Sequence, residues 1–188
     1  MKKNLARKVY LKKRRSLAKE QFNKLENEII FNCIQFIKDL NPKVVHCYLP
    51  INNKHEINTE LIFEYCWTNE IKTVVPISNF KRNTMISASY TKQTKLLKNK
   101  YGIPEPLNPI IYINEDIELV ITPLVAFDKL GHRVGFGKGF YDRFFSICNP
   151  KIKKVGISLF EPINKIEDTN ELDISLNHVI TPRKIFNF

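Results

Sequence analysis

The most regular hydrophobic pattern in the sequence runs from residue 20 to residue 40. Apolar side chains recur there at intervals of three and four residues, with charged residues between them. They are Phe22, Leu25, Ile29, Cys33, Phe36 and Leu40. This spacing predicts a helix with one apolar side, which we expect to pack on a sheet. Asn41 and Pro42 should end the helix.

Short apolar runs elsewhere predict strands. They cover residues 44–49, 73–75, 85–90, 119–127 and 155–160, and a last strand, HVIT, precedes Pro182. Pro50 and Pro76 should close the first two strands. A helix is expected near residues 58–68. Since no repeat or linker divides the chain, we expect one domain over residues 1–188.

Residues 91–117 show little periodicity and contain Pro104, Pro106 and Pro109. The segment YGIPEP is too rich in proline for a helix or a central strand. We therefore expect a long irregular loop over residues 101–114. Loops of this length in compact domains are often functional, and Tyr101 would offer a ring for stacking.

A glycine loop follows the apolar run that ends near residue 127. In RVGFGKGFYDRFF, residues 133–145, three glycines alternate with Phe136 and Lys138. Glycine lets backbone N–H groups approach closely and adopt positive φ, and successive N–H groups at a helix start favour an anion. The loop predicts a phosphate site. Taken alone it also fits a glycine-rich hairpin under a sheet edge, since neither GxxxxGK[ST] nor GxGxxG is present.

The segment after the glycines predicts a helix. Phe140, Phe144 and Ile147 would share its core side. Asp142 would fall in the first turn, where the helix dipole favours a carboxylate. A carboxylate beside a phosphate loop also suits Mg²⁺, so Asp142 has both a structural and a metal-binding interpretation.

The first 19 residues are basic and contain no acidic side chain. Lys3, Arg7, Tyr10 and Arg14 are spaced by four, three and four, so they share one side of a helix. The helix fits a solvated basic surface, an arm that binds nucleic-acid phosphates, or a surface for a small anion. A mitochondrial transit peptide is also basic and acid-free, but usually carries more Ser.

The 188-residue chain has a net charge of +11, which attracts anions of any kind. Lys, Asn and Ile are abundant, a typical result of nucleotide-composition bias, so part of this charge need not be functional. No apolar stretch approaches the roughly 20 residues that span a bilayer, and a secretory signal is absent, so we expect no membrane partner. The four scattered cysteines predict reduced thiols in a cytoplasmic protein.

Two titratable side chains stand near the first predicted strand. His46 and Cys47 are neighbours within it and should point to opposite faces, so we interpret His46 as a core histidine. Glu56 follows in a polar turn. Because α/β proteins bind ligands in loops after parallel strands, Glu56 is a candidate ligand-binding residue. The alternative is an exposed turn carboxylate.

Residues 123–142, PLVAFDKLGHRVGFGKGFYD, resemble the 5-formyltetrahydrofolate cyclo-ligase (5,10-methenyltetrahydrofolate synthetase) family. That family has a PLLAFD-like segment followed by G-x-R-L-G-[YR]-G-x-G-Y-Y-D. The similarity extends to Lys3 and Arg7, to HEINT and GIPEP, and to Asp173 before HVITP, in the same order. It implies an α/β sandwich with a central, mostly parallel sheet flanked by helices, as in sugar-phosphate isomerases and CoA transferases.

The resemblance also implies an enzyme, a ligase that uses ATP and Mg²⁺ to convert 5-formyltetrahydrofolate to 5,10-methenyltetrahydrofolate with release of ADP and phosphate. The formyl oxygen would be phosphorylated before the second folate nitrogen closes the ring. The partners would be these small molecules, including folates that carry more than one glutamate. We expect a monomer without a specific nucleic-acid partner.

The resemblance assigns residues to these roles. Lys138 and Arg133 would be catalytic, and Asp142 and Asp173 would hold Mg²⁺. ATP would be bound by Lys3, Arg7, Arg133, Val134, Gly135, Phe136, Gly137, Lys138, Gly139, Phe140 and Tyr141. The folate would be bound by Leu49, Glu56, Tyr101, Phe136, Phe140 and Tyr141.

The chain departs from the family pattern at four positions. Phe136 replaces a usual Tyr or Arg, and Phe140 replaces a usual Tyr, so both lose a polar end. Leu172 and Asn177 stand where many members have His and Asp near the expected metal ligand. A basic nucleic-acid-binding protein and another ATP or sugar-phosphate enzyme of the same fold remain alternatives.

Overall fold

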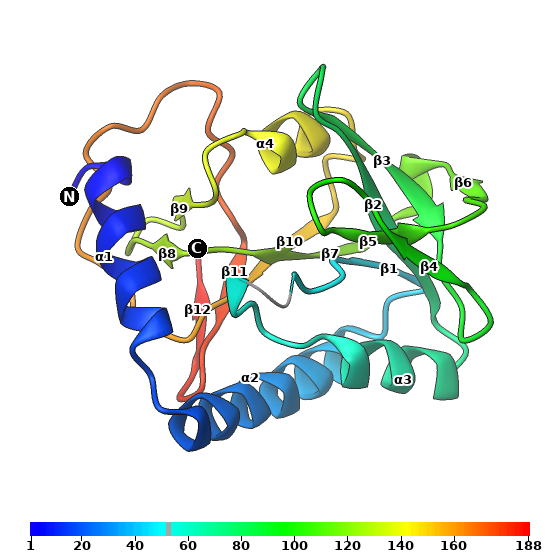
Figure 1. The fold of residues 1–188 in the computed structure, drawn as a ribbon, viewed down its shortest axis with the longest axis horizontal. Helices are drawn as coiled ribbons and strands as arrows, with labels where there is room; N and C mark the ends of the chain where they lie inside the picture. Colours follow the sequence, from blue (N-terminus) through cyan, green and yellow to red (C-terminus); the bar gives the residue numbers. More distant parts are fainter. Residues whose placement is uncertain (52–53) are drawn as a thin grey trace.

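The computed structural model describes residues 1–51 and 54–188, and a single sheet of eight strands organises them. The strands are β1 Val44–Cys47, β2 Lys72–Asn79, β3 Thr84–Ser89, β6 Ile111–Tyr112, β7 Leu119–Pro123, β10 Lys153–Ile157, β11 His178–Ile180 and β12 Ile185–Asn187. Their order is β12-β11-β10-β7-β1-β2-β3-β6 (Figure 1). The five strands from β11 to β2 are parallel, and β12, β3 and β6 are antiparallel additions at the edges. The predicted α/β architecture is confirmed.

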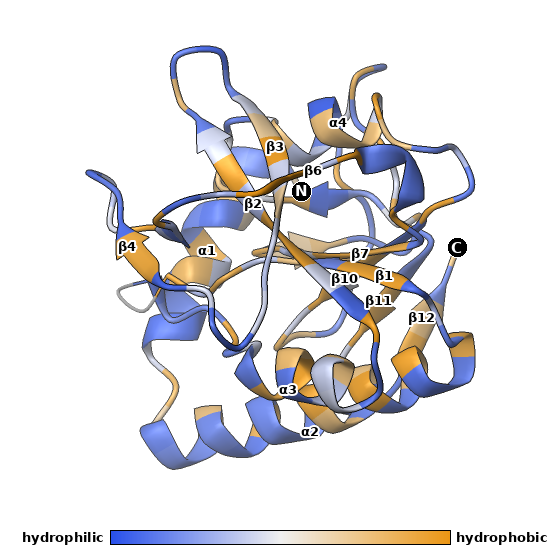
Figure 2. Cartoon of the chain, turned by 90° about the vertical axis from the view of Figure 1, so that its right-hand side faces the viewer, coloured by the Kyte–Doolittle hydropathy of each residue, from blue (hydrophilic) through white to orange (hydrophobic). Residues whose placement is uncertain are grey.

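Helices cover both faces of this sheet. They are α1 Lys3–Arg15, α2 Lys19–Leu40, α3 Glu60–Thr68 and α4 Phe140–Phe145. In Figure 1, α2 and α3 lie below the sheet, α4 above it and α1 at its left. Because neighbours in a strand point to opposite faces, Val45 packs with Ile29 and Ile62 while Val44 packs with Phe144. Figure 2 shows the apolar positions turned inward between these layers. Among the described residues, no helix is long and apolar enough to cross a membrane.

Two small ribbons complete the fold. One joins β4 Leu96–Lys98 to β5 Pro104–Pro106, and the other joins β8 Ala126–Phe127 to β9 Arg133–Val134. The apolar run 119–127, predicted as one strand, is therefore divided between β7 and β8. The break matters because β9 leads directly into the glycine loop, which the β8–β9 ribbon holds beside α1.

Three other predictions about the elements were wrong. Pro76 does not end β2, which continues to Asn79, because β2 is paired with β1 only as far as Val74 and a proline is tolerated on the unpaired side beyond it. The loop expected over residues 101–114 contains β5 and β6, which lie in a two-stranded ribbon and at a sheet edge, where proline is accepted. Ile147 is 61% exposed, because α4 ends at Phe145.

Candidate active site

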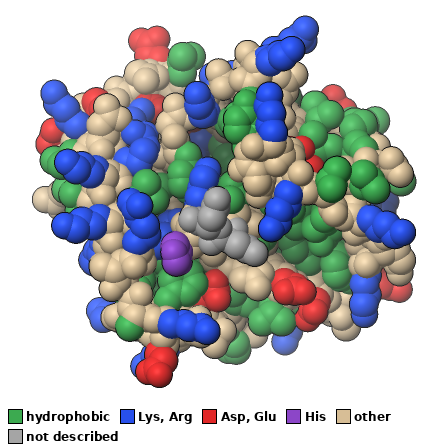
Figure 3. Space-filling view, in the orientation of Figure 1, with side chains coloured by type: hydrophobic (Ala, Val, Ile, Leu, Met, Phe, Trp, Pro, Cys, Tyr) green, Lys and Arg blue, Asp and Glu red, His purple; other side chains and the backbone are tan. Residues whose placement is uncertain are grey.

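The glycine loop and the segment after β1 face each other at the carboxyl edge of the parallel strands. The Lys54 ammonium lies 4.6 Å from the ring centroid of Phe136 in the glycine loop. Open α/β sheets bind their ligands at this edge. In Figure 3, Lys and Arg side chains crowd over α1 and around the middle of this face. The face therefore offers positive charge where the fold class predicts a ligand.

The backbone of the glycine loop is shaped to present its N–H groups. Gly137 and Gly139 have φ values of 92° and 64°, which side-chain-bearing residues adopt only with strain. In the described part of the chain, none of the N–H groups of residues 135–139 donates a hydrogen bond. The carbonyls are held instead: Arg7 Nε donates to the Gly135 oxygen at 2.8 Å, and Arg143 Nη2 donates to the Lys138 oxygen. Free donors over a run of five residues make a cradle for an anion.

Helix α1 turns its basic side toward this loop. A Cβ atom added at Gly137 would lie 3.4 Å from Arg7 Cζ, so the guanidinium packs directly against the loop. Arg14 on the same side is only 4% exposed and donates to the Leu124 carbonyl at 2.6 Å. Tyr10 packs on Phe160, with ring centroids 5.4 Å apart. This arrangement supports the small-anion interpretation of the helix over a solvated surface.

Two carboxylates and two cations meet beside the loop. Arg133 Nη2 donates to Asp142 Oδ1 at 2.6 Å, and Lys3 Nζ lies 2.5 Å from Asp173 Oδ2. Ile174, the residue that follows Asp173 in the chain, connects the two pairs. Its N–H donates to Asp142 Oδ1 at 3.1 Å, and its carbonyl accepts a hydrogen bond from Arg133 Nη1. Burial lowers the pKa of Arg133, and the Asp142 carboxylate opposes this shift.

The donor set fits a metal that is shared with a nucleotide. Among the described residues, no three His, Cys, Asp or Glu side chains come together as an all-protein metal cage. Mg²⁺ in phosphoryl-transfer sites is typically held by one or two carboxylates together with substrate phosphates. Asp142 and Asp173 match that requirement. Asp142 also lies in the first turn of α4, as predicted.

Glu56 lies in a cavity of about 600 Å³ between α3 and the β4–β5 ribbon. Its side chain is 8% exposed, which rules out the interpretation as an exposed turn carboxylate. Oε2 accepts the N–H of Ile51 at 2.8 Å. Burial raises the pKa of Glu56, and the Ile51 hydrogen bond and the charge of Arg14 offset part of the shift. Leu49, also predicted to contact the folate, lines the same cavity.

Three aromatic rings form a row at the other side of the site. The ring centroids of Tyr101 and Phe80 lie 3.9 Å apart in a tilted contact, and Phe80 lies 5.2 Å from Phe140 in an edge contact. Phe80 was not among the predicted site residues. Its signal in the sequence was an aromatic residue within the polar turn NFKRN, between the strands now seen as β2 and β3.

Two of the predicted ATP-binding residues have side chains that pack into the core instead of lining the glycine loop. Val134 is buried in β9, where it pairs with β8 and its carbonyl accepts the Val125 N–H at 2.8 Å. The Tyr141 ring packs 6.4 Å from His46, and its hydroxyl is buried without a hydrogen-bond partner in the described part of the chain. Burial raises the pKa of Tyr141 well above its usual value.

His46 is a core residue, as predicted. It is fully buried against Phe144, with ring centroids 4.7 Å apart, and Cys47 packs in the core on the opposite face of the sheet. Both ring nitrogens lack a hydrogen-bond partner among the described residues. Burial lowers the pKa of His46 to about 3, so the ring is neutral at physiological pH.

Comparison with known proteins decides the family. The sequence profile of the 5-formyltetrahydrofolate cyclo-ligase family matches residues 1–182. The chain belongs to this family. It is 26% identical over 181 residues to the 5-formyltetrahydrofolate cyclo-ligase of Escherichia coli K12, covering 94% of this chain and 98% of that protein. It is 29% identical over 134 residues to that of Haemophilus influenzae, covering 69% of this chain and 70% of the relative.

Two solved structures show the same fold. The 5,10-methenyltetrahydrofolate synthetase of Aquifex aeolicus has a TM-score of 0.83 at 28% identity, covering 100% of this chain and 93% of that chain. That of Mycoplasma pneumoniae has a TM-score of 0.80 at 25% identity, covering 97% and 100%. This member of the cyclo-ligase family is thus an enzyme of folate one-carbon metabolism with 5,10-methenyltetrahydrofolate synthetase activity, as predicted. The roles of individual residues remain predictions.

Proposed function

We propose that this chain catalyses ATP- and Mg²⁺-dependent cyclisation of 5-formyltetrahydrofolate, with the triphosphate on the glycine loop. The observation that carries this proposal is the run of N–H groups from residue 135 to residue 139 that donate no hydrogen bond within the described residues. Arg7 packs against this run and Arg133 lies just before it. A polyanion is the ligand that such a combination binds best.

The chemistry requires that an amide oxygen become a leaving group. The formyl oxygen attacks the γ-phosphorus and ADP departs. The second folate nitrogen then attacks the formyl carbon and loses its proton, and the oxygen leaves as inorganic phosphate. Because phosphoryl transfer depends mainly on positioning and charge neutralisation, fixed backbone donors and cations supply what the step needs.

The chain's own residues divide these tasks. Lys138 and Arg133 would neutralise charge on the transferred phosphoryl group, and Lys3 and Arg7 would hold the rest of the nucleotide. Asp142 and Asp173 would hold Mg²⁺, which neutralises phosphate charge when bound. Both carboxylates already have a cationic partner in Arg133 or Lys3, so nucleotide and metal would enter an existing charge network.

The folate would lie between the Glu56 cavity and the row of aromatic rings. A buried carboxylate with one oxygen on the Ile51 N–H keeps its other oxygen for the N–H donors of a pterin. Tyr101, Phe140 and Phe136 offer ring faces or edges to flat heterocycles.

All four cysteines are buried and free, which supports the predicted reducing cytoplasm, and a monomer remains the expected state.

The direct test is to mix the purified protein with 5-formyltetrahydrofolate, Mg²⁺ and ATP and to follow the near-ultraviolet absorbance of the methenyl product. We expect a rise that stops when ATP or Mg²⁺ is omitted, with one ADP released per product. Product formed without ATP would refute the phosphorylation route. A flat trace from folded protein would refute the proposed reaction.

A further inference from the structure

Arg14 is a buried arginine to which the reaction described above gives no task. It follows Lys3 and Arg7 along the same side of α1, but its side chain is closed off from solvent. Nη2 donates to the Leu124 carbonyl at 2.6 Å, and Nε is buried without a hydrogen-bond partner among the described residues. Burying a guanidinium is costly unless an opposite charge lies near it, so Arg14 needs a counter-charge.

The ends of two neighbouring strands hold Arg14 and Glu56 near each other. Glu56 Oε2 accepts the Ile51 N–H beyond the end of β1, and Arg14 donates to the carbonyl of Leu124, the residue after β7. β1 and β7 are parallel neighbours, and continuing their register brings Leu124 level with Pro50, the residue before Ile51. Since neighbouring strands lie about 4.8 Å apart, the carboxylate and the guanidinium are anchored to adjacent points of the sheet edge.

The two groups also stabilise each other's charge. Burial raises the pKa of Glu56, and the Ile51 hydrogen bond and the Arg14 guanidinium oppose this rise. Burial lowers the pKa of Arg14, and Glu56 opposes this fall, as an ionised Tyr48 would. Burial raises the pKa of Tyr48 well above its usual value, so Tyr48 is neutral at physiological pH. Glu56 is therefore the counter-charge that Arg14 requires.

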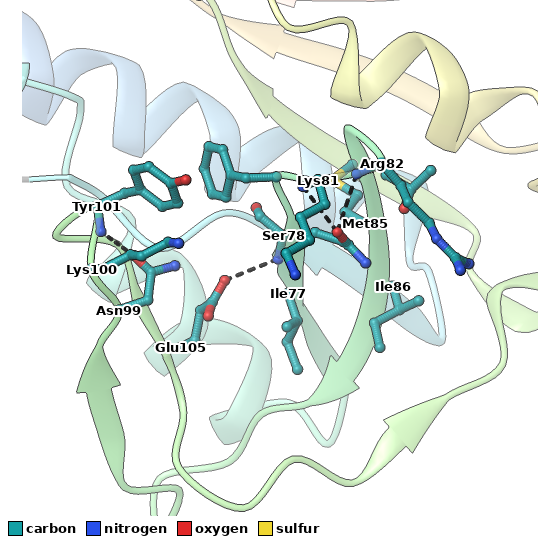
Figure 4. A pocket seen from close by; sticks show the side chains of 13 residues that line it. Ile77, Ser78, Lys81, Arg82, Met85, Ile86, Asn99, Lys100, Tyr101 and Glu105 are labelled. Carbon is teal, nitrogen blue, oxygen red and sulfur yellow. Dashed lines mark hydrogen bonds between the residues drawn. The ribbon is translucent and has the colours of Figure 1, made fainter.

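Other titratable groups face Glu56 from the surrounding elements. Lys54, from the same segment, also opposes the rise in the pKa of Glu56, but it is exposed to solvent. Tyr141 on α4 is neutral, because burial raises its pKa well above its usual value. The charged residues in the rest of the Glu56 cavity are exposed and of both signs: Glu60, Glu64, Lys92 and Lys98. A different cavity, of about 580 Å³ between the β2–β3 hairpin and the segment 99–105 (Figure 4), is lined by Lys81, Arg82 and Lys100.

Arg14 and Glu56 are close without forming a direct ion pair. None of the ion pairs within 4 Å in the described part of the chain joins them. A guanidinium in contact would occupy the carboxylate with its own N–H groups. A cation just beyond contact still stabilises the negative charge, because the buried surroundings screen it less than water does, and it leaves Oε1 free to accept from a ligand.

We propose that Arg14 is a positioning residue of the folate site, whose charge keeps Glu56 ionised while leaving its free oxygen to the N–H donors of the pterin. The proposal rests on the proposed function of Glu56. Arg14 would act through Glu56 without touching either substrate. The helix that presents Lys3 and Arg7 to the nucleotide would then also set the charge of the folate site.

The first test measures the ionisation of Glu56 directly and needs no substrate. Carbon-13 NMR of the glutamate carboxyl groups would be followed from pH 4 to pH 9, with the Glu56 signal assigned by its loss in Glu56→Gln. In Arg14→Gln and in Arg14→Met, two neutral variants of similar size, Glu56 should titrate at higher pH than in the wild type, because the stabilising cation is gone. An unchanged titration of Glu56 in these variants would overturn the proposal.

Two further variants are the controls for this titration. Arg14→Lys retains the positive charge and a donor for the Leu124 carbonyl, so Glu56 should titrate close to its wild-type pH. Arg15→Gln removes an exposed arginine from the next position of the same helix and should leave the titration unchanged. A shift as large in Arg15→Gln as in Arg14→Gln would show a general effect of net charge and would overturn the proposal.

The second test connects this charge to folate binding. We expect KM for 5-formyltetrahydrofolate to rise about tenfold in Arg14→Gln at pH 6, and the gap to close to within about twofold at pH 8, where Glu56 ionises in both proteins. kcat and KM for ATP should change little, because the pterin contact is equally present before and during the chemical step. In the Glu56→Gln background, Arg14→Gln should change KM less than about twofold, because no carboxylate is left to ionise.

Equal losses in the two backgrounds, or a gap in KM that does not depend on pH, would mean that Arg14 only supports the fold, and would overturn the proposal. Failure of the proposed reaction gives a different result. A shifted Glu56 titration in a protein that forms no methenyl product would refute the reaction and would still support Arg14 as the group that sets the charge of Glu56.

Discussion

Lys3 and Asp173 form an ion pair, with Nζ 2.5 Å from Oδ2, although 170 positions separate them in the chain. Their side chains are only 18% and 21% exposed, so the pair is better shielded from water than a typical surface ion pair. It brings the first helix and the C-terminal segment to the side of the glycine loop. Arg133 and Asp142 form a second ion pair beside it. Both pairs lie where we propose that phosphate and metal bind.

We expect Asp142→Asn to reduce kcat at least about 100-fold, the scale found for the loss of one group that stabilises developing charge. Asparagine retains an oxygen for Arg133 and for the Ile174 N–H, so the fold should be kept, with a melting temperature within a few degrees of the wild type. Steady-state absorbance kinetics and thermal unfolding would be measured together. The control is Asp39→Asn, at an exposed position on α2. Full activity in the Asp142 variant would remove this carboxylate from the metal site.

Replacing Lys3 and Arg7 together by alanine should raise KM for ATP about tenfold or more, because two cations would leave the phosphate site. KM for the folate should change little. The matched control is Lys8→Ala/Lys12→Ala, which removes two exposed cations from the same helix. If KM for ATP is the same in both double variants, the helix acts only as a charged surface.

Glu56 should make the fold less stable at neutral pH, because burial raises its pKa. A carboxylate with a raised pKa stabilises the folded state only when protonated, so this contribution is present below the unfolded pKa and is lost as pH rises through the folded pKa. Glu56→Gln should therefore melt higher than the wild type at pH 7, and the gap should narrow toward pH 4. The same variant should raise KM for the folate.

Thermal unfolding from pH 4 to pH 8 checks the Glu56 prediction, with Glu20→Gln, at an exposed position on α2, as the control. A gap in melting temperature that does not depend on pH would show that the buried charge has no effect on stability. An unchanged KM for the folate would contradict the assignment of Glu56 to the pterin.

His46 should produce acid sensitivity. Its pKa is lowered by burial to about 3, whereas an unfolded histidine has a pKa of about 6.5. The stability that it contributes is therefore fully present above the unfolded pKa and is lost as pH falls toward the folded pKa, with a slope of up to about 1.4 kcal/mol per pH unit. Urea unfolding of His46→Leu and of the wild type between pH 4 and pH 7 would measure the difference.

In the leucine variant, we expect a shallower loss of stability below pH 6.5. His178→Leu, at a partly exposed histidine of β11, is the control and should keep the wild-type slope. Equal slopes in the wild type and in His46→Leu would mean that the buried ring is not protonated on unfolding in this range.

Much of the fold was predictable because its signals are local. A segment with the apolar spacing seen from Phe22 to Leu40 forms a helix whichever partner it packs against. A buried run such as residues 44–49 has few alternatives to a strand. Pro76 misled the prediction because the cost of a proline depends on whether a neighbouring strand needs its N–H, and β1 does not extend that far. Ile147 was misplaced because α4 ends two residues earlier than its apolar spacing.

The sequence by itself determined the family, the glycine loop and the candidates for its chemistry, because a run of glycines with a nearby Lys and Asp restricts the backbone and the charge locally. Only the tertiary structure decided which side chains meet. The pairing of Lys3 with Asp173, the burial of Glu56 and the contact of Phe80 with Tyr101 join residues from distant segments. Such contacts depend on strand order and on the loops that cross the sheet edge, and local spacing carries no information about either.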